Sequence, residues 1–228
     1  MLKFEEKWWQ LLDNLINMLY IISTPIGNLG DISLRAIDTL EKVDYLLCED
    51  TRKTGLLLQN LQIKNKPKLI SFYDEVEDQK IPEIIKLLSD NKEVGLVTDA
   101  GTPVISDPGW KLIRKCRSLG IEYTALPGAC AAIDALVLSG IPSGRFSFLG
   151  FLPKKTGERK KILEKYKNID GAKIIYESPF RVKKLEEEIK EIFGEVNLVI
   201  IREVTKKFEE VLTTVNKEIK GEVVVIFE

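Results

Sequence analysis

The sequence predicts an α/β protein of two domains, with a mostly parallel α/β domain first and a mixed-sheet α+β domain second. From residue 18 onward, short and nearly continuous apolar runs alternate with amphipathic segments, which is typical of strands covered by helices on both faces. Near the end of the chain, three apolar runs follow one another with only short links, which favours antiparallel pairing. The pattern of predicted elements changes at "GIPSG" (140–144), so we expect domains over 18–140 and 141–228.

The first domain is expected to open with a strand over 18–23, followed by a helix that Asp31 caps and that continues to Val43. Asp107 and Pro108 are expected to begin a later helix, as N-cap and first helical residue, and Gly120 to end it. The remaining expected strands cover 43–50, 68–74, 93–103 and 121–129, and the remaining helices 81–92 and 131–140. Residues 1–17 have an amphipathic helical pattern, which fits either an N-terminal helix or a start site upstream of the true one at Met18.

The second domain is expected to contain a basic helix over 154–167 and another helix that begins at Pro179. Its strands are predicted over 145–153, 172–179, 196–204, 209–215 and 221–228.

Composition excludes several classes of function. These 228 residues contain no histidine, which excludes nucleophiles activated by histidine and zinc sites with histidine ligands. The three cysteines are widely spaced and do not suggest a disulfide framework, so a reducing compartment is expected. No apolar run is long enough to span a bilayer, and the first residues do not resemble a secretory signal. The sequence therefore predicts a cytoplasmic protein without a membrane partner.

Charge is balanced overall but uneven locally. The net charge is −1, so the chain as a whole lacks the basic character of many nucleic-acid binders. The segment 154–167, "KKTGERKKILEKYK", nevertheless contains seven basic and two acidic residues. It fits either a solvated helix face or a surface that contacts a phosphate backbone, with Lys154, Lys155, Arg159 and Lys160 as candidates.

Four turns of small and acidic residues follow predicted strands, at 24–31, 48–54, 98–109 and 126–132. In an open α/β sheet such turns converge on one edge, where ligands bind. Small residues let the backbone approach a nucleoside closely. Neither a P-loop nor G-x-G-x-x-G is present, and Pro25 lacks an N–H, so a phosphate is a poor ligand for the first turn. S-adenosyl-L-methionine fits instead, since it combines an adenosine with a sulfonium and has no phosphate. No metal site is expected.

Six motifs in order, "TPIGNLGDISLRA", "EDTRKT", "DAGTPVISDPG", "LPGACAA", "YESPFR" and "REVTK", resemble the tetrapyrrole methylase superfamily, in the branch that methylates small-subunit ribosomal RNA. The resemblance runs from Met18 to about Glu228. It implies a two-domain tetrapyrrole-methylase-like fold, S-adenosyl-L-methionine bound between the domains, and a homodimer. It also implies 2′-O-methylation of a cytidine in the decoding region of 16S rRNA, as free rRNA or in an assembled 30S subunit.

Position by position, the resemblance assigns cofactor binding to three loops and one residue of the second domain: Pro25 and Gly27; Asp99, Ala100, Gly101, Thr102, Pro103, Val104 and Ser106; Leu126, Pro127, Gly128 and Ala129; and Tyr176. Candidates for accepting the proton of the ribose hydroxyl are Glu49, Asp50, Glu177 and Lys206. Arg52, Arg181 and Arg202 are either structural ion pairs or phosphate contacts.

Two departures from the family pattern stand out. Family members often have a histidine in the segment that matches "SFYDEVED", and many continue past the last strand, which bears on RNA contacts. Two alternatives stay open: a relative that methylates a small molecule or a protein, and a non-catalytic module that binds S-adenosyl-L-methionine. A phosphate-transfer enzyme is disfavoured because no set of carboxylates suited to Mg²⁺ is evident.

Overall fold

The computed structural model describes residues 18–216 and 218–228, so the helix predicted over 1–17 lies outside the described residues. The chain forms two compact units. The described part of the first covers 18–25 and 29–129, and the second comprises Ile26–Asn28 and Cys130–Glu228. The grouping differs from the boundary predicted after residue 140, because helix α6 (Ala131–Ser139) packs on strands of the second unit.

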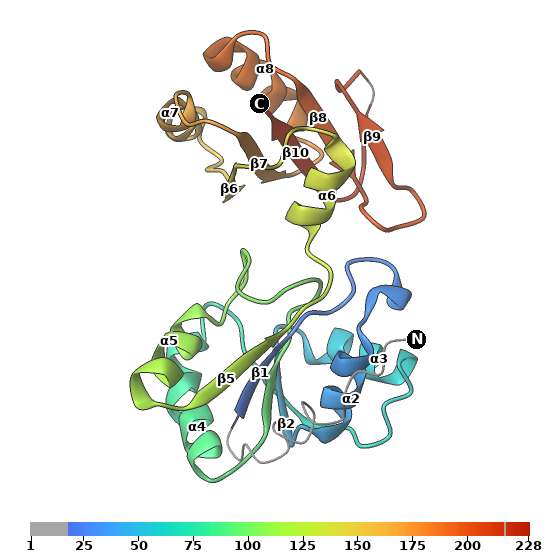
Figure 1. Ribbon diagram of the computed structural model, residues 1–228, viewed down its shortest axis with the longest axis vertical. Coiled ribbons are helices and arrows are strands. Elements are labelled where there is room, and N and C mark those ends of the chain that lie inside the picture. Colours follow the sequence, from blue (N-terminus) through green and yellow to red (C-terminus); the bar gives the residue numbers. More distant parts are fainter. Residues whose placement is uncertain (1–17, 217) are drawn as a thin grey trace. The chain divides into compact units, whose positions relative to one another are not determined.

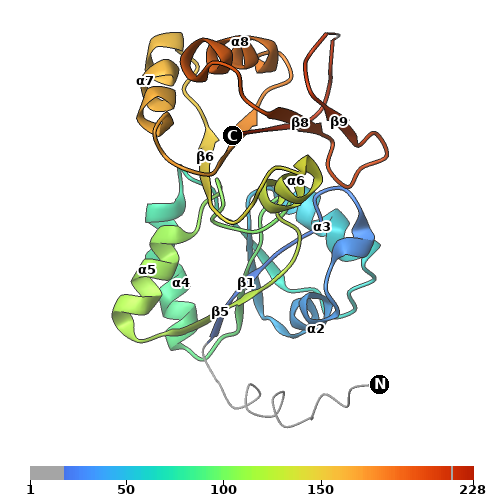
Figure 2. The ribbon, with the colours of Figure 1, turned by 45° about the horizontal axis from the view of Figure 1, so that its top comes forward.

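The first unit is a parallel five-stranded sheet with helices on both faces (Figure 1). The strand order is β3-β2-β4-β1-β5. The strands are β1 (Met18–Ile22), β2 (Tyr45–Cys48), β3 (Lys68–Ser71), β4 (Val94–Leu96) and β5 (Glu122–Leu126). Helices α2 (Leu34–Lys42) and α3 (Thr51–Asn60) cover one face, and α4 (Glu77–Ser89) and α5 (Trp110–Leu119) cover the other (Figures 1 and 2).

Neighbouring residues of the central strands are buried on opposite faces of this sheet. Ile21 and Leu47 belong to the cluster that includes residues of α4 and α5, whereas Ile22 and Leu46 belong to the one beneath α2 and α3. Successive side chains of a strand alternate between faces, so a sheet covered on both sides requires continuous apolar strands. This confirms the predicted fold class.

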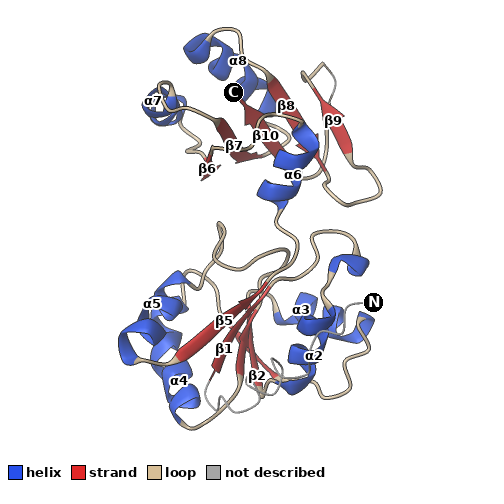
Figure 3. Ribbon diagram, viewed as in Figure 1, coloured by secondary structure: helices blue, strands red, loops and turns tan. Residues whose placement is uncertain are grey.

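The second unit is built on a mixed sheet with strand order β6-β7-β10-β8-β9 (Figure 3). Strands β6 (Phe146–Phe151) and β7 (Ala172–Glu177) are parallel. The other pairings, of β8 (Leu198–Arg202), β9 (Glu210–Leu212) and β10 (Val223–Phe227), are antiparallel, as predicted.

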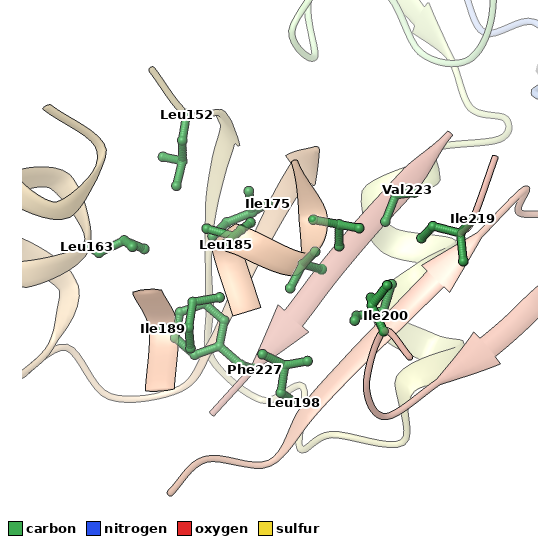
Figure 4. Packing of buried hydrophobic residues seen from close by; sticks show 13 residues of the cluster. Leu152, Leu163, Ile175, Leu185, Ile189, Leu198, Ile200, Ile219, Val223 and Phe227 are labelled. Carbon is green, nitrogen blue, oxygen red and sulfur yellow. The ribbon is translucent and has the colours of Figure 1, made fainter. Parts of the chain in front are cut away.

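Helices α7 (Thr156–Tyr166) and α8 (Val182–Phe193) cover the face of this sheet opposite α6 (Figures 1 and 2). Leu185 and Ile189 of α8 pack with Val223 and Phe227 of β10 in the core of this unit (Figure 4).

Several predicted helix starts are wrong, including that of α8, which begins at Val182 and not at Pro179. Ser33, and not Asp31, caps α2 by accepting a hydrogen bond from the N–H of Ala36 at 3.1 Å, while Asp31 ends a short 3₁₀ turn, η1 (Leu29–Asp31). Helix α4 begins at Glu77, so Pro82 lies inside it and not in its first turn.

A further correction concerns α5, which begins at Trp110 with Gly109 as N-cap, and not at Asp107 and Pro108. The buried carboxylate of Glu77 accepts a hydrogen bond from the N–H of Gly109 at 3.0 Å. The side chain of Glu77 in α4 thus stabilises the start of α5, and Asp107 does not cap this helix.

Candidate functional site

The loops after β1, β4 and β5 are joined at the carboxyl edge of the first unit's sheet. Thr24 and Gly101 exchange two backbone hydrogen bonds, of 2.9 and 3.1 Å. The hydroxyl of Thr102 donates to the carbonyl of Ala129 at 2.9 Å and lies 3.0 Å from the hydroxyl of Ser23. The loop segments predicted to bind the cofactor, 99–103 and 126–129, therefore come together with Ser23 and Thr24, next to Pro25.

Close packing explains the glycines of this edge. A Cβ on Gly128 would lie 2.7 Å from the Cβ of Ser23, and Gly101 has a φ of 89°, which L-residues rarely adopt. Close packing against Ser23 thus explains Gly128, and the left-handed backbone explains Gly101.

The segment after Pro103 is strained. Val104 and Ser106 have φ angles of 77° and 68°, in the left-handed region, which is especially unfavourable for a β-branched residue. Conformations of this kind cost about 1–3 kcal/mol each and persist where the surroundings impose them, often at functional sites. The strained turn leads directly to Asp107.

The loops after β2 and β4 are joined through carboxylates. Asp99 accepts hydrogen bonds from the N–H of Asp50 at 3.2 Å and from Lys53 at 2.7 Å, and its own N–H donates to Glu49 at 3.1 Å. Asp50 caps α3 by accepting from the N–H of Arg52 at 2.8 Å, and its carboxylate also pairs with the Arg52 guanidinium.

These carboxyl groups differ in their affinity for protons. Burial, reinforced by the negative charge of Asp99, raises the pKa of Glu49. Burial and then the charge of Glu49 raise the pKa of Asp107 to about 7. The hydrogen bonds from Arg52, by contrast, lower the pKa of Asp50. Asp107 can therefore hold and release a proton near neutral pH, Glu49 binds a proton more tightly than an ordinary glutamate, and Asp50 stays ionised.

Sequence reasoning missed Asp107 as a site residue. The motif "SDPG" has the form of a helix start, and a capping role accounted for the aspartate. The displaced cap at Gly109 depends on Glu77, which lies 32 residues away in sequence. The sequence carries no local signal of that contact.

In the second unit, the two predicted catalytic residues are held in ion pairs. Glu177 is 3% exposed and pairs with Arg181 at 2.5 Å. Lys206 pairs with Glu222 at 2.7 Å and with Glu203 at 3.2 Å. Burial works to lower the pKa of Lys206, but the hydrogen bonds and attraction to Glu222 and Glu203 raise it on balance. Lys206 is therefore protonated near neutral pH, which argues against its predicted role as a proton acceptor.

Gly27 of the opening motif packs within the second unit. A Cβ at this position would overlap the aliphatic stem of Lys206. The close approach of the Lys206 stem thus explains the glycine. Lys206 also donates a hydrogen bond to Glu203, and Glu203 and Thr205 have left-handed backbone conformations with φ of 53° and 64°. The predicted cofactor residue Tyr176 packs against Phe148 and Phe151, and its hydroxyl accepts from the N–H of Ala132 at 3.0 Å.

The structure corrects the assignment of Arg159 to the RNA surface. Its side chain is 2% exposed and pairs with Glu188 through two hydrogen bonds of 2.5 and 2.6 Å. It also donates to the carbonyls of Pro153 and Lys154 at 3.1 Å each. Arg159 is therefore a buried residue that links α8 to the loop before α7, and it cannot reach a phosphate from this position.

The other predicted RNA-binding residues remain at the surface to different degrees. Lys154 and Lys155 are exposed, and Arg52 is exposed while paired with Asp50. Lys160 pairs with Glu191 at 2.6 Å, and Arg202 pairs with Glu210 at 3.0 Å.

No group of three or more potential metal ligands occurs within residues 18–216 and 218–228. In the same part of the chain, every helix is too short or too polar to cross a membrane.

Comparisons with known proteins agree on one family. Residues 18–220 match the family model described as Tetrapyrrole (Corrin/Porphyrin) Methylases. A Haemophilus influenzae protein named ribosomal RNA small subunit methyltransferase I is 43% identical, over 94% of this chain and 80% of its own length. A protein of the same name from a Hydrogenobaculum species is 44% identical, over 91% of this chain and 94% of its own.

Solved structures of the same fold are more distant in sequence. Diphthine synthase superposes with a TM-score of 0.71 at 13% identity, over 92% of this chain and 89% of that one. A uroporphyrin-III-C-methyltransferase from Thermus thermophilus gives a TM-score of 0.64 at 17% identity, over 92% of this chain and 94% of that one. At such low identity these structures support the fold alone.

Proposed function

We propose, from the premise that this chain belongs to the tetrapyrrole methylase family, that it methylates the ribose 2′-oxygen of a cytidine in the decoding region of 16S rRNA. The observation that carries this proposal is the identity of 43–44% with proteins named ribosomal RNA small subunit methyltransferase I, over more than nine-tenths of this chain. S-adenosyl-L-methionine is the methyl donor of the family. The substrate is rRNA, free or in the assembled small subunit.

The carboxyl edge of the first unit's sheet fits a nucleoside cofactor without phosphate. The joined loops at Gly101 and Gly128 bring backbone groups close together, and neither loop has the glycine pattern of a phosphate site. We assign the cofactor to residues 99–103 and 126–129, and we expect Asp99 to accept a hydrogen bond from a ribose hydroxyl. When bound, the sulfonium supplies a methyl group on a good leaving group, so positioning provides much of the rate.

Among the predicted proton acceptors, the protonation states favour Glu49. Asp50 is held ionised by Arg52, and Lys206 is held protonated by two carboxylates. Glu177 is paired with Arg181 inside the second unit. Glu49 has a raised pKa. Among the described residues it accepts a hydrogen bond from the N–H of Asp99 alone, through one oxygen, and the other oxygen could accept from a substrate hydroxyl.

The test is transfer of tritiated methyl from S-adenosyl-L-methionine to small subunits that lack the modification, and to free 16S rRNA, followed by mapping of ribose methylation. We expect label on a cytidine 2′-oxygen. Glu49→Gln should lower kcat about 100-fold with unchanged cofactor affinity, while Asp50→Asn should retain most of the activity. Label on a base, or turnover of a tetrapyrrole alone, would contradict the proposal.

We propose further that the protein acts in the cytoplasm as a homodimer. Light scattering on the purified chain checks the oligomeric state, and a mass of one chain would contradict it.

A further inference from the structure

The carboxyl ends of β6 and β7 carry exposed aromatic side chains that the proposed reaction does not use. The two strands are parallel, so both end at the same edge of the second unit's sheet. A register shift between Phe148 and Gly150, with Gly150 at a φ of 60°, brings Phe151 opposite Tyr176. The ring of Phe151 packs 5.4 Å from that of Tyr176 and is nevertheless exposed at 65%.

The turn after β7 holds a second aromatic ring in solvent. Phe180 is 92% exposed, more than any other large hydrophobic residue that the structure describes. Its N–H donates to the hydroxyl of Ser178 at 3.3 Å, and the N–H of Arg181 donates to the carbonyl of Ser178 at 2.9 Å. Arg181 is anchored in turn on the buried carboxylate of Glu177. The hydrogen bonds to Ser178 and the ion pair of Arg181 thus fix the turn that carries Phe180.

Cations lie on the same two loops. Lys154 and Lys155 lie three and four residues after Phe151 in the loop after β6. Both are exposed, and Lys155 pairs with Glu158 at 3.3 Å. The guanidinium of Arg159 fixes this loop through the carbonyls of Pro153 and Lys154. Arg181 lies next to Phe180 in the chain, but Glu177 balances its charge. Two exposed rings and two exposed lysines therefore lie on loops at one sheet edge, in a protein whose net charge is −1.

We propose that Phe151 and Phe180 form a platform on which unpaired bases of a single-stranded RNA stack, while Lys154 and Lys155 contact its phosphates. Exposed aromatic rings on a cationic surface are the combination by which proteins bind single-stranded nucleic acid. Sequence-specific RNA recognition uses bases that are splayed out of the helix and stacked on aromatic side chains. The inference depends on the proposed RNA substrate and adds residues that would hold bases of that RNA.

The experiment compares Phe151→Leu, Phe180→Leu and the double variant with the unchanged protein. The probe is a fluorescent single-stranded cytidine-rich oligoribonucleotide, and a second probe has the same ribose-phosphate backbone with abasic positions. Because stacking contributes about 1–3 kcal/mol per base, each variant should bind the first probe about 5- to 150-fold more weakly. Binding of the abasic probe, and of S-adenosyl-L-methionine by calorimetry, should be unchanged.

Two further variants act as controls. Phe180→Trp should restore binding of the base-containing probe, because a tryptophan ring also stacks. Phe208→Leu removes another phenylalanine of the second unit, 63% exposed, and should leave binding of both probes unchanged.

The proposal fails if Phe151→Leu and Phe180→Leu bind the base-containing probe like the unchanged protein. It also fails if the abasic probe loses as much affinity, since the effect would then be structural and not due to stacking. The methylation proposal is judged separately by ribose labelling. If no ribose is labelled but the variants still lose binding of the base-containing probe alone, the methylation proposal fails and the stacking proposal stands.

Discussion

At the scale of single residues, the candidate site requires glycine at a position where a Cβ atom would clash with a neighbouring loop. Gly128 lies against the side chain and backbone of Ser23, where a Cβ has no room, whereas Gly55 in α3 has open space around it. The same residue type is thus required in one place and merely tolerated in the other.

Gly128→Ala should destabilise the protein by about 1–3 kcal/mol, since the new Cβ forces the loop away from Ser23. It should also weaken binding of S-adenosyl-L-methionine, because the loop lies at the proposed cofactor edge. Gly55→Ala should stabilise the protein by about 0.5–1 kcal/mol, since alanine favours the helix. Chemical denaturation and calorimetry provide both measurements, and equal effects of the two substitutions would contradict this account.

Asp107 makes folding stability depend on pH. Its pKa rises from an ordinary value of 3.8 to about 7 in the folded state, first through burial and then through the charge of Glu49, with smaller contributions from Asp74 and Asp99. Between these values the folded state binds a proton that the unfolded state does not. This group's contribution to stability is therefore present at low pH and is lost as pH rises towards 7.

Asp107→Asn should remove this dependence. The difference in unfolding free energy between Asp107→Asn and the unchanged protein should shift in favour of the variant as pH rises from about 5 to 8. Denaturation series at several pH values measure it. The surface substitution Asp38→Asn serves as the control. Parallel pH curves for Asp107→Asn and the unchanged protein would be inconsistent with a proton that Asp107 binds in the folded state.

At the scale of helices and strands, most of the pattern could be predicted from the sequence. Apolar periodicity located the strands and most helices after residue 18, because burial on a sheet or helix face is recorded in local sequence. Helix α3 (Thr51–Asn60) was not predicted, and it begins within the segment 48–54 that was interpreted as a turn. Helix starts were less predictable. Asp31 and Ser33 are both good caps two residues apart, and the cap of α5 depends on Glu77 from another helix.

The basic helix shows a second limit of sequence reasoning. Arg159 lies among lysines but on the helix face shared with the buried Leu163, and its partner Glu188 is on the face of α8 that holds Leu185. Arg159 lies four residues before Leu163, and Glu188 lies three residues after Leu185. These helical spacings could have indicated that both charged side chains face the core. Only the packing of α7 on α8 shows that they meet.

Ser33→Ala should destabilise the protein by about 1 kcal/mol, because the N–H of Ala36 loses its acceptor. Asp31→Ala should cost much less, since Asp31 does not cap α2. Thermal and urea unfolding of the two variants compare the caps directly, and a larger cost for Asp31→Ala would refute the assignment.

Breaking the Arg159–Glu188 pair should cost about 3–5 kcal/mol for either single substitution, Arg159→Met or Glu188→Leu, because a buried charge is left alone. The double substitution should cost less than either single one. A double-mutant cycle measured by denaturation checks this, and simple additivity of the two costs would argue against a coupled pair.

At the scale of the whole molecule, binding of RNA must rely on local charge. The net charge of −1 provides no general attraction to a polyanion, so the exposed lysines after β6 carry this part of the proposal. Conversion of Lys154 and Lys155 to Gln should weaken RNA binding and reduce the slope of log K against log salt by about 0.7 per lysine. Lys66→Gln, before β3 in the first unit, should change neither quantity, and an unchanged slope in the double variant would exclude the lysines as phosphate contacts.

The two-unit organisation has a consequence for dissecting the protein. Residues Ile26–Asn28 group with the second unit, although the chain on both sides of them belongs to the first. A cut between Ala129 and Cys130 therefore does not release two self-sufficient fragments. The C-terminal fragment would lack the glycine turn that seats the stem of Lys206, and the N-terminal fragment would carry that turn without its partner. Mixed together, such halves are suited to complementation, in which each supplies what the other has lost.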